Sequence, residues 1–162
     1  MAPELGVMYR DHAAAVWRYA RSRLPSDADA DDLTSDVFAR ALRSASGYDP
    51  TRGNPRMWLM GIARHAAADW YRRRSPEDPR AEVPELAGHD DPAAAAERME
   101  QAGGVRALLE HLTDREREAI ALRFGAELPA AEIGELLGTS ATGARMLVHR
   151  AVTKLRGVVA DG

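Results

Sequence analysis

Apolar residues recur at helical spacing in the first half of the chain and predict three successive helices. These cover Val7 to Leu24, about Asp29 to Ser44, and about Pro55 to Arg74. Turn-forming sequences, Pro25-Ser26-Asp27 and a polar loop that begins at Gly47, separate them. The spacing predicts a buried stripe of Tyr9, Ala13, Val16, Trp17, Ala20, Leu33, Val37, Phe38, Ala41, Leu42, Trp58, Leu59, Ile62, Ala63 and Ala66. No strand pattern competes, so the predicted fold class is all-α.

Residues 112–155 repeat the helical pattern on both sides of a short break, which indicates a helix-turn-helix. In this break, Gly138 suits the left-handed backbone that ends a helix. A hydroxyl of Thr139 or Ser140 suits the capping of the next helix. The apolar positions around the break are Ile133, Leu136, Leu137, Ala144, Leu147, Val148, Ala151 and Leu155.

The second helix of this motif has a basic face. No acidic residue occurs between Ser140 and Arg156, and the basic side chains and histidine there are Arg145, His149, Arg150, Lys154 and Arg156. Positive side chains on a helix that approaches the major groove are typical of DNA recognition. A two-helix corner with a solvated basic face fits the pattern alone equally well.

Composition narrows the classes of function. The 162 residues include no cysteine, which excludes disulfides, thiolate metal sites and cysteine catalysis. The five histidines lack the spacing of metal ligands and no nucleophile stands beside a base, so we predict no metal, no cofactor and no enzyme. No apolar stretch is long enough for a membrane span and the N-terminus lacks a signal-peptide core, which predicts a cytoplasmic protein.

Charge is distributed unevenly along the chain, whose net charge is −3. Residues 76–103 hold two basic and eight acidic side chains, with several prolines and few large apolar residues. Such a segment does not form a core, and it divides the chain into domains at 1–75 and 104–162. The acidic segment is predicted to be a linker, either a passive spacer or a mimic of nucleic-acid charge.

The third predicted helix and the loop before it combine arginines with aromatic residues. Unpaired bases stack on aromatic or guanidinium planes while nearby cations hold the backbone, so this combination indicates single-stranded nucleic acid. The residues are Tyr48, Arg52, Arg56, Trp58, Arg64, Trp70, Tyr71, Arg72, Arg73 and Arg74. Trp58 is expected mainly in the core.

Several segments together resemble the extracytoplasmic-function (ECF) subgroup of bacterial sigma factors. They occur in the family's order: ADADDLTSDVFARAL, YDPTRGNPRMWLMGIARHAAADWYRRR, LTDREREAIALRF, EIGELLGTS and HRAVTKL. The resemblance implies a first domain, a three-to-four-helix bundle, that binds the polymerase clamp and the promoter's minus-ten element. It implies a second, helix-turn-helix domain that binds the minus-thirty-five element and the polymerase flap.

The resemblance also assigns residues to each contact. For core polymerase they are Asp31, Asp32, Leu33, Asp36 and Phe38; alternatively, Asp31 and Asp32 only favour the dipole of their helix. For the minus-ten element they are Asn54, Arg56, Arg64, His65, Trp70, Arg72, Arg73 and Arg74. For the minus-thirty-five element they are Ser140, Thr142, Arg145, His149 and Arg150.

Three positions depart from the family's pattern. His65 stands where asparagine is usual, Gly143 lies inside the first turns of the recognition helix, and Leu147 replaces a usual cation. We expect Leu147 to be buried, Arg145 to be exposed, and the second domain alone to bind DNA weakly.

The sequence therefore predicts a non-enzymatic sigma factor that binds core RNA polymerase and promoter DNA and has no small-molecule substrate. An anti-sigma factor is a further candidate partner. We expect the protein in the cytoplasm, at the nucleoid when active and at the membrane when an anti-sigma factor holds it there. The alternatives are a sigma-like interaction protein and a helix-turn-helix regulator, neither of which initiates transcription.

Overall fold

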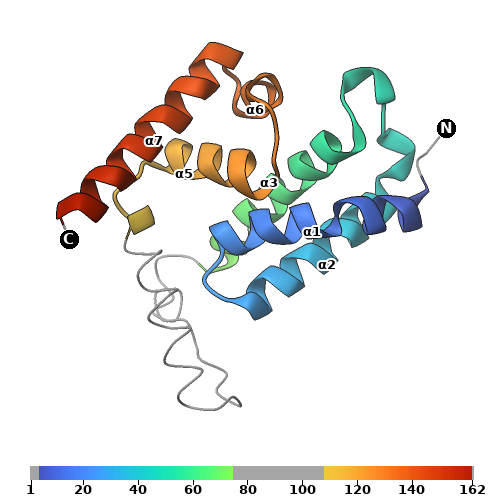
Figure 1. Ribbon diagram of the computed structural model, residues 1–162. Coiled ribbons are helices and arrows are strands. Elements are labelled where there is room, and N and C mark those ends of the chain that lie inside the picture. Colours follow the sequence, from blue (N-terminus) through green and yellow to red (C-terminus); the bar gives the residue numbers. More distant parts are fainter. Residues whose placement is uncertain (1–3, 75–107, 162) are drawn as a thin grey trace.

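The computed structural model describes residues 4–74 and 108–161 (Figure 1). The predicted linker at 76–103 lies wholly outside them. The described part is all-helical, as predicted. Its α-helices are α1 (Leu5–Arg23), α2 (Asp27–Arg43), α3 (Pro55–Arg73), α5 (Asp114–Ile120), α6 (Ala130–Leu137) and α7 (Ala141–Asp161). Shorter turns are η1 (Ala45–Gly47), η2 (Pro50–Arg52) and the π-helical turn η4 (Ala121–Gly125). We call α1–α3 the N-terminal group and α5–α7 with η4 the C-terminal group.

Side-chain caps fix where several helices begin. The Ser26 hydroxyl accepts a hydrogen bond from the Asp29 amide at the start of α2, and the Asn54 side chain accepts from the Met57 amide at the start of α3. Thr113 and Glu116 form a reciprocal capping box at the start of α5. These local bonds satisfy backbone amides that have no partner within a helix.

The N-terminal group is held by α2 packing against α1 and α3. Most of the predicted stripe lies in or against the core, but Tyr9 and Leu42 are 54% and 66% exposed and were wrongly expected inside. Tyr9 makes only an edge-to-face contact with Phe38, at 4.9 Å between ring centroids. In the last turn of α2, Ala41 is the residue that is buried, so Leu42 points away from the packed face.

The C-terminal group contains the predicted helix-turn-helix, formed by α6 and α7. Gly138 ends α6 in the left-handed conformation, with φ of 72°. Ser140, rather than Thr139, caps α7, because its hydroxyl accepts from the Gly143 amide at 3.0 Å. Gly134 allows the turn to close, since a Cβ there would lie 2.7 Å from the Thr139 carbonyl oxygen. The turn therefore follows the sequence prediction.

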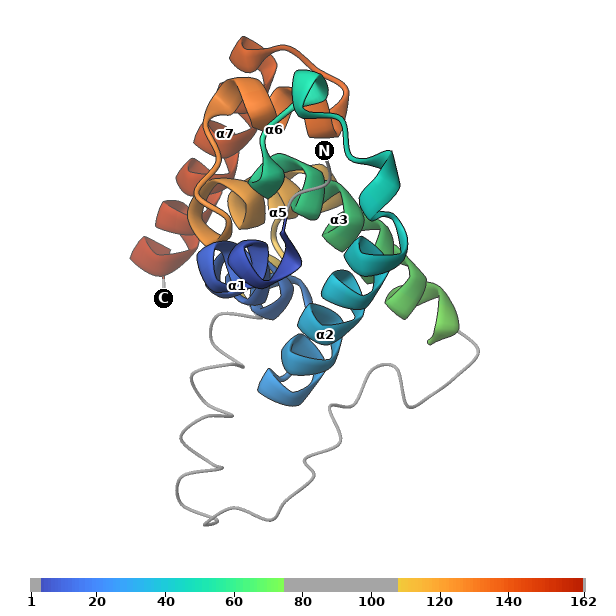
Figure 2. The same cartoon turned by 90° about the vertical axis from the view of Figure 1, so that its right-hand side faces the viewer.

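The two groups pack against each other (Figures 1 and 2). The contact is made chiefly by η4 against α1, and Leu122 and Leu128 share one buried cluster with Val16 and Tyr19. A Cβ on Gly125 would lie 3.1 Å from the Tyr19 amide nitrogen, so the glycine permits this close approach of the two backbones. The contact also covers part of α3. Some of the predicted minus-ten residues there therefore contact the C-terminal group rather than solvent.

Candidate nucleic-acid interface

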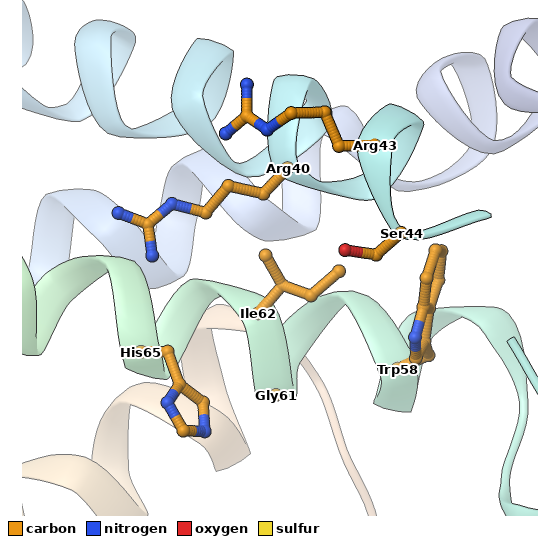
Figure 3. A pocket seen from close by; sticks show the side chains of 7 residues that line it. All are labelled: Arg40, Arg43, Ser44, Trp58, Gly61, Ile62 and His65. Carbon is orange, nitrogen blue, oxygen red and sulfur yellow. The ribbon is translucent and has the colours of Figure 1, made fainter. Parts of the chain in front are cut away.

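An open pocket of about 520 Å³ lies between the end of α2 and the middle of α3 (Figure 3). Arg40 and Arg43 line it from α2, and Trp58, Ile62 and His65 line it from α3. Sequence reasoning had singled out His65 for nucleic acid but had not assigned Arg40 and Arg43 to this site. The available signal was the basic last turn of α2, which comes directly before the loop that contains Tyr48 and Arg52.

Arg40 is held in place by carboxylates on both helices. Its guanidinium lies 3.1 Å from Asp36 and 2.8 Å from Asp69, which ties α2 to α3 beside the pocket. Arg43 and His65 are exposed. Trp58 is half-buried and meets Tyr48 edge to face, at 5.1 Å between ring centroids. The pocket thus offers a partly fixed aromatic edge, the exposed His65 imidazole and the exposed Arg43 guanidinium, beside an Arg40 guanidinium that is already paired.

Trp70 and the arginines after it lie at the end of α3. The guanidinium carbon of Arg74 lies 3.9 Å from the centre of the Trp70 ring, and the Tyr71 ring meets Trp70 edge to face at 4.9 Å. Arg72 pairs with Asp69, while Arg73 is exposed. Trp70 is half-buried, so this end of α3 combines a partly accessible indole with positive charge.

The other three minus-ten candidates contact the C-terminal group instead. Arg64 Nε lies 2.8 Å from Glu118 Oε1, and a second Arg64 nitrogen donates to the Leu136 carbonyl. Arg56 donates to the Ala126 carbonyl at 3.3 Å, and the Asn54 amide donates to Glu132. The predicted set is therefore divided: His65, Trp70 and Arg72–Arg74 lie apart from this contact, whereas Asn54, Arg56 and Arg64 are engaged in it.

Burial and charge perturb two groups beside this contact. The pKa of Tyr19 is raised well above 10 by burial and by the Glu118 carboxylate, which accepts its hydrogen bond at 2.5 Å. Tyr19 therefore stays protonated and serves as a donor. Burial and the nearby Arg56 guanidinium lower the pKa of His12, whose Nδ1 accepts from Arg56 at 3.3 Å.

The candidate recognition helix α7 presents Arg145, His149 and Arg150 to solvent together with Thr142. Ser140 is exposed but its hydroxyl is used as the cap of α7. Arg145 is thus exposed, as expected. Leu147 packs against the core but is only half-buried, so its expected full burial was too strong.

The acidic candidates on α2 differ in their surroundings. Asp32 is exposed and Asp36 is partly exposed beside Arg40. Asp31 accepts from the Trp17 indole at 2.8 Å, which ties α2 to α1. Because α2 begins at Asp27, its first turn contains Asp27 and Asp29. The alternative role of Asp31 and Asp32 at the helix dipole is therefore wrong.

The apolar candidates on α2 serve packing. Leu33 is 3% exposed and lies in the core, so it is not accessible to a partner. Phe38 is half-buried against Tyr9.

An apolar hollow of about 420 Å³ lies on the C-terminal group, between η4 and α7. Sequence reasoning had not identified it. Two of its lining residues, Phe124 and Val159, are 58% and 64% exposed, so apolar surface gathers at this hollow. The hollow is lined by Ile120, Phe124, Val152, Leu155, Arg156, Val159 and Ala160.

Within 4–74 and 108–161, no helix combines the length and apolar character needed to cross a membrane. In the same part of the chain, no group of three or more histidines and carboxylates is arranged to hold a metal ion.

Family models and related proteins match both helical groups of the chain. The model of sigma-70 region 2 matches residues 8–77, and that of sigma-70 region 4 matches residues 108–157. The ECF RNA polymerase sigma factor ShbA of Streptomyces griseus is 34% identical over 154 residues, which cover 87% of this chain and 80% of ShbA. CarQ, an RNA polymerase sigma factor of Myxococcus xanthus, is 33% identical over 95% of this chain and 88% of its own.

A solved structure has a similar fold over nearly the whole chain. CnrH, in complex with the cytosolic domain of CnrY, is matched with a TM-score of 0.74 and 26% identity, covering 97% of this chain and 88% of CnrH. The chain belongs to the ECF family of RNA polymerase sigma factors, with the N-terminal group as region 2 and the C-terminal group as region 4. Members of this non-enzymatic family bind core RNA polymerase and promoter DNA and mediate transcription initiation.

Proposed function

We propose that this sigma factor reads an unpaired base of the minus-ten element in the pocket between α2 and α3. The observation that carries the proposal is that Trp58, His65, Arg40 and Arg43 line one open pocket of about 520 Å³. The Trp58 ring offers a surface against which a base can pack, and the imidazole offers both a donor and an acceptor to a base edge. Arg43, which is exposed, supplies charge for a neighbouring phosphate, while Arg40, paired with Asp36 and Asp69, holds α2 to α3 beside the pocket.

Trp70 and Arg72–Arg74 extend this surface along the end of α3. Arg74 covers part of one face of Trp70, so we expect the remaining accessible face to receive the next base. Arg72 and Arg73 then contact phosphates. Asn54, Arg56 and Arg64 join the minus-ten contact only after they leave their partners in the C-terminal group.

The exposed face of α7 is the proposed reader of the minus-thirty-five element. Arg145, His149 and Arg150 form its cationic surface, and Thr142 adds a hydroxyl in the first turn. Helix N-terminal turns approach base edges in this class of motif, so Arg145 is the main candidate for a base contact. With Leu147 packed against the core, few side chains remain for base contacts, and region 4 binds weakly by itself.

Two separate surfaces are the proposed contacts with core RNA polymerase. Asp32 and Asp36 present negative charge on α2 for the clamp, with Phe38 beside them, while Asp31 and Leu33 serve packing within the N-terminal group. The apolar hollow beside Phe124 is the proposed seat of the flap. The domain limits that go with these roles are 1–75 for region 2, 76–103 for the linker and 104–162 for region 4.

An anti-sigma partner belongs to the same proposal. CnrH was solved with a cytosolic domain of another protein bound to it. We expect a comparable partner to hold this chain inactive in the cytoplasm, or at the membrane where the partner is a membrane protein. Release then sends the sigma factor to core polymerase at the nucleoid.

Run-off transcription with purified core RNA polymerase tests the function. The templates come from a promoter library with randomised minus-ten and minus-thirty-five elements. The templates that yield transcripts then also identify the promoter sequences that this sigma factor recognises. We expect transcripts only when the chain is present, and their loss with His65→Ala, which removes a pocket side chain that is exposed. Stable binding to core without any transcript would favour the sigma-like interaction protein instead.

A further inference from the structure

Three side chains of region 2 converge on a single carboxylate of region 4. The Tyr19 hydroxyl lies 2.5 Å from Glu118 Oε1, Arg64 Nε lies 2.8 Å from the same oxygen, and Arg23 Nε lies 2.9 Å from Oε2. The Glu118 side chain is only 10% exposed. A carboxylate buried to this degree is stable only when opposite charges and donors surround it, and here α1 and α3 supply all three.

The polar contacts between the two regions run in one direction. Donors come from region 2 and acceptors come from region 4 in every described hydrogen bond or ion pair that joins them. The hydrogen-bond donors are Arg18, Tyr19, Asn54, Arg56 and Arg64, and Arg23 adds a cation that pairs with Glu118. The acceptors are the carboxylates of Glu118, Glu127 and Glu132 and the carbonyls of Gly125, Ala126 and Leu136.

Nucleic acid would offer these donors the same chemistry. Phosphates present anionic oxygens and base edges present carbonyl oxygens, and Arg64 already binds one of each kind, the Glu118 carboxylate and the Leu136 carbonyl. Its guanidinium cannot hold these partners and a promoter strand at the same time. Arg56 is in the same position, because the Ala126 carbonyl accepts its hydrogen bond.

We propose that region 4 is an internal competitor for the nucleic-acid surface of region 2, and that Glu118 is the latch that holds the two regions closed. The part of this proposal that concerns DNA rests on the minus-ten role given to Arg64 and Arg56 under the proposed function. Closed and open forms are in equilibrium, and a ligand that binds only the open form shifts the population toward it. Weakening the latch therefore strengthens apparent DNA binding without adding a contact.

The latch can be weakened without changing a DNA-contacting residue. Glu118→Gln removes the charge that pairs with Arg23 and Arg64 but keeps the shape of the side chain. Tyr19→Phe removes one donor from the other side and keeps the buried ring. Glu127→Gln is the matched control, because Glu127 lies at the edge of the same interface, 3.8 Å from Arg18, with its side chain 64% exposed.

Opening can be measured directly by fluorescence energy transfer. Because the chain has no cysteine, dyes can be placed on Ala39→Cys in α2 and Thr153→Cys in α7, both at exposed positions. We expect high transfer in the wild type and in Glu127→Gln. In Glu118→Gln and Tyr19→Phe we expect lower transfer, with the open population raised about tenfold by the former because a buried charge pair has been broken. Unchanged helical circular dichroism verifies that each variant is folded.

A second measurement tests the competition. Fluorescence anisotropy with a pool of short single-stranded oligonucleotides of random sequence should show tighter binding by Glu118→Gln, by about the same tenfold factor, and unchanged binding by Glu127→Gln. Equal transfer in all folded proteins would overturn the latch. Lower transfer with unaltered oligonucleotide binding would overturn the competition. Run-off transcription by the wild type decides the proposed function separately, since the transfer measurement requires neither polymerase nor promoter.

Discussion

Lys154 Nζ lies 2.7 Å from Glu116 Oε1 and joins the middle of α7 to the first turn of α5. The same carboxylate accepts the Thr113 amide as part of the capping box. Burial acts to raise the pKa of Glu116, but the hydrogen bonds from Lys154 and Thr113 outweigh it and the pKa lies below its usual 4.5. One buried carboxylate therefore stabilises both a helix start and the packing of region 4.

This pairing predicts how stability depends on pH. The pKa of Glu116 is lower in the folded state, so its contribution is present above the unfolded value of 4.5 and is lost as pH falls through the folded value. Glu116→Gln should lower the free energy of unfolding at neutral pH by about 1 kcal/mol and should flatten its decline in acid. Urea unfolding at neutral pH and in acid measures both effects. Glu135→Gln, at an exposed position in α6, is the control, and equal pH dependence in all three proteins contradicts the assignment.

Asp32 provides the clearest test of the clamp contact, because it is exposed whereas Asp36 is paired with Arg40. Asp32→Arg should weaken association with core RNA polymerase by about tenfold through charge repulsion, without loss of helicity. Competition against a labelled sigma factor measures the affinity. Asp11→Arg makes the same charge reversal at an exposed position of α1 and should have little effect. If both substitutions weaken binding equally, net charge rather than the α2 surface is responsible.

Gly143 departs from the family's pattern, and the structure gives a physical reason. A Cβ at this position would lie 2.2 Å from Thr139 Oγ1, so the Thr139 side chain must move before any other residue fits. Gly143→Ala alone should therefore gain less than the roughly 1 kcal/mol expected from helix propensity. Combining it with Thr139→Ala should recover that gain, since Ser140 is the cap of α7. A double-mutant cycle from thermal unfolding measures the coupling, and purely additive effects would refute the steric explanation.

Local signals were sufficient to predict most of the fold. Ser26, Gly138 and Ser140 each act on residues within a few positions of themselves, so α2 and the helix-turn-helix could be read from the sequence. The latch could not be predicted from the sequence, because Tyr19 and Arg64 are 99 and 54 residues away from Glu118. Nothing in the run Asp114-Arg-Glu-Arg-Glu-Ala distinguishes Glu118 from a solvated acid. Only the packing of the two regions reveals that it is buried.

The residues of the candidate site also fall into those that local sequence predicts and those that only tertiary packing reveals. The sequence pattern identified His65, Trp70 and the arginines of α3, whose neighbours in the helix show the basic and aromatic character directly. Arg40 and Arg43 belong to a different helix and join them only through the packing of α2 on α3. The pocket is thus a tertiary feature that helical spacing alone does not contain.

Trp70 is predicted to act after the promoter strands separate. Trp70→Ala should reduce open-complex formation more than recruitment to duplex DNA, because stacking contributes roughly 1–3 kcal/mol per base only when bases are unpaired. Permanganate reactivity of unpaired thymines reports opening, and a template with a pre-melted bubble should largely restore activity. Tyr71→Phe keeps the ring against Trp70 and loses only the hydroxyl that donates to the Arg23 carbonyl. Failure of the bubble to rescue Trp70→Ala would assign Trp70 to packing within region 2.

Alanine substitutions at Arg145 and Leu147 should affect different properties, promoter affinity and stability, although the two residues are only two positions apart on α7. Arg145 is exposed, so Arg145→Ala should lower promoter affinity by about 1–3 kcal/mol if it pairs with a base edge, and should relax discrimination at one upstream position. Leu147 is half-buried against the core, so Leu147→Ala should instead destabilise region 4 by about 1–2 kcal/mol.

Melting temperature and promoter affinity, measured on both variants, separate the two roles. Leu147→Arg restores the cation usual in the family and is the decisive variant. Because the side chain is only half-buried, the arginine stem can stay on the core while its charge reaches solvent. We therefore expect a small loss of stability together with stronger, more salt-dependent DNA binding. A large loss of stability with no gain in binding would mean that Leu147 faces the core too closely for a cation to reach DNA from this position.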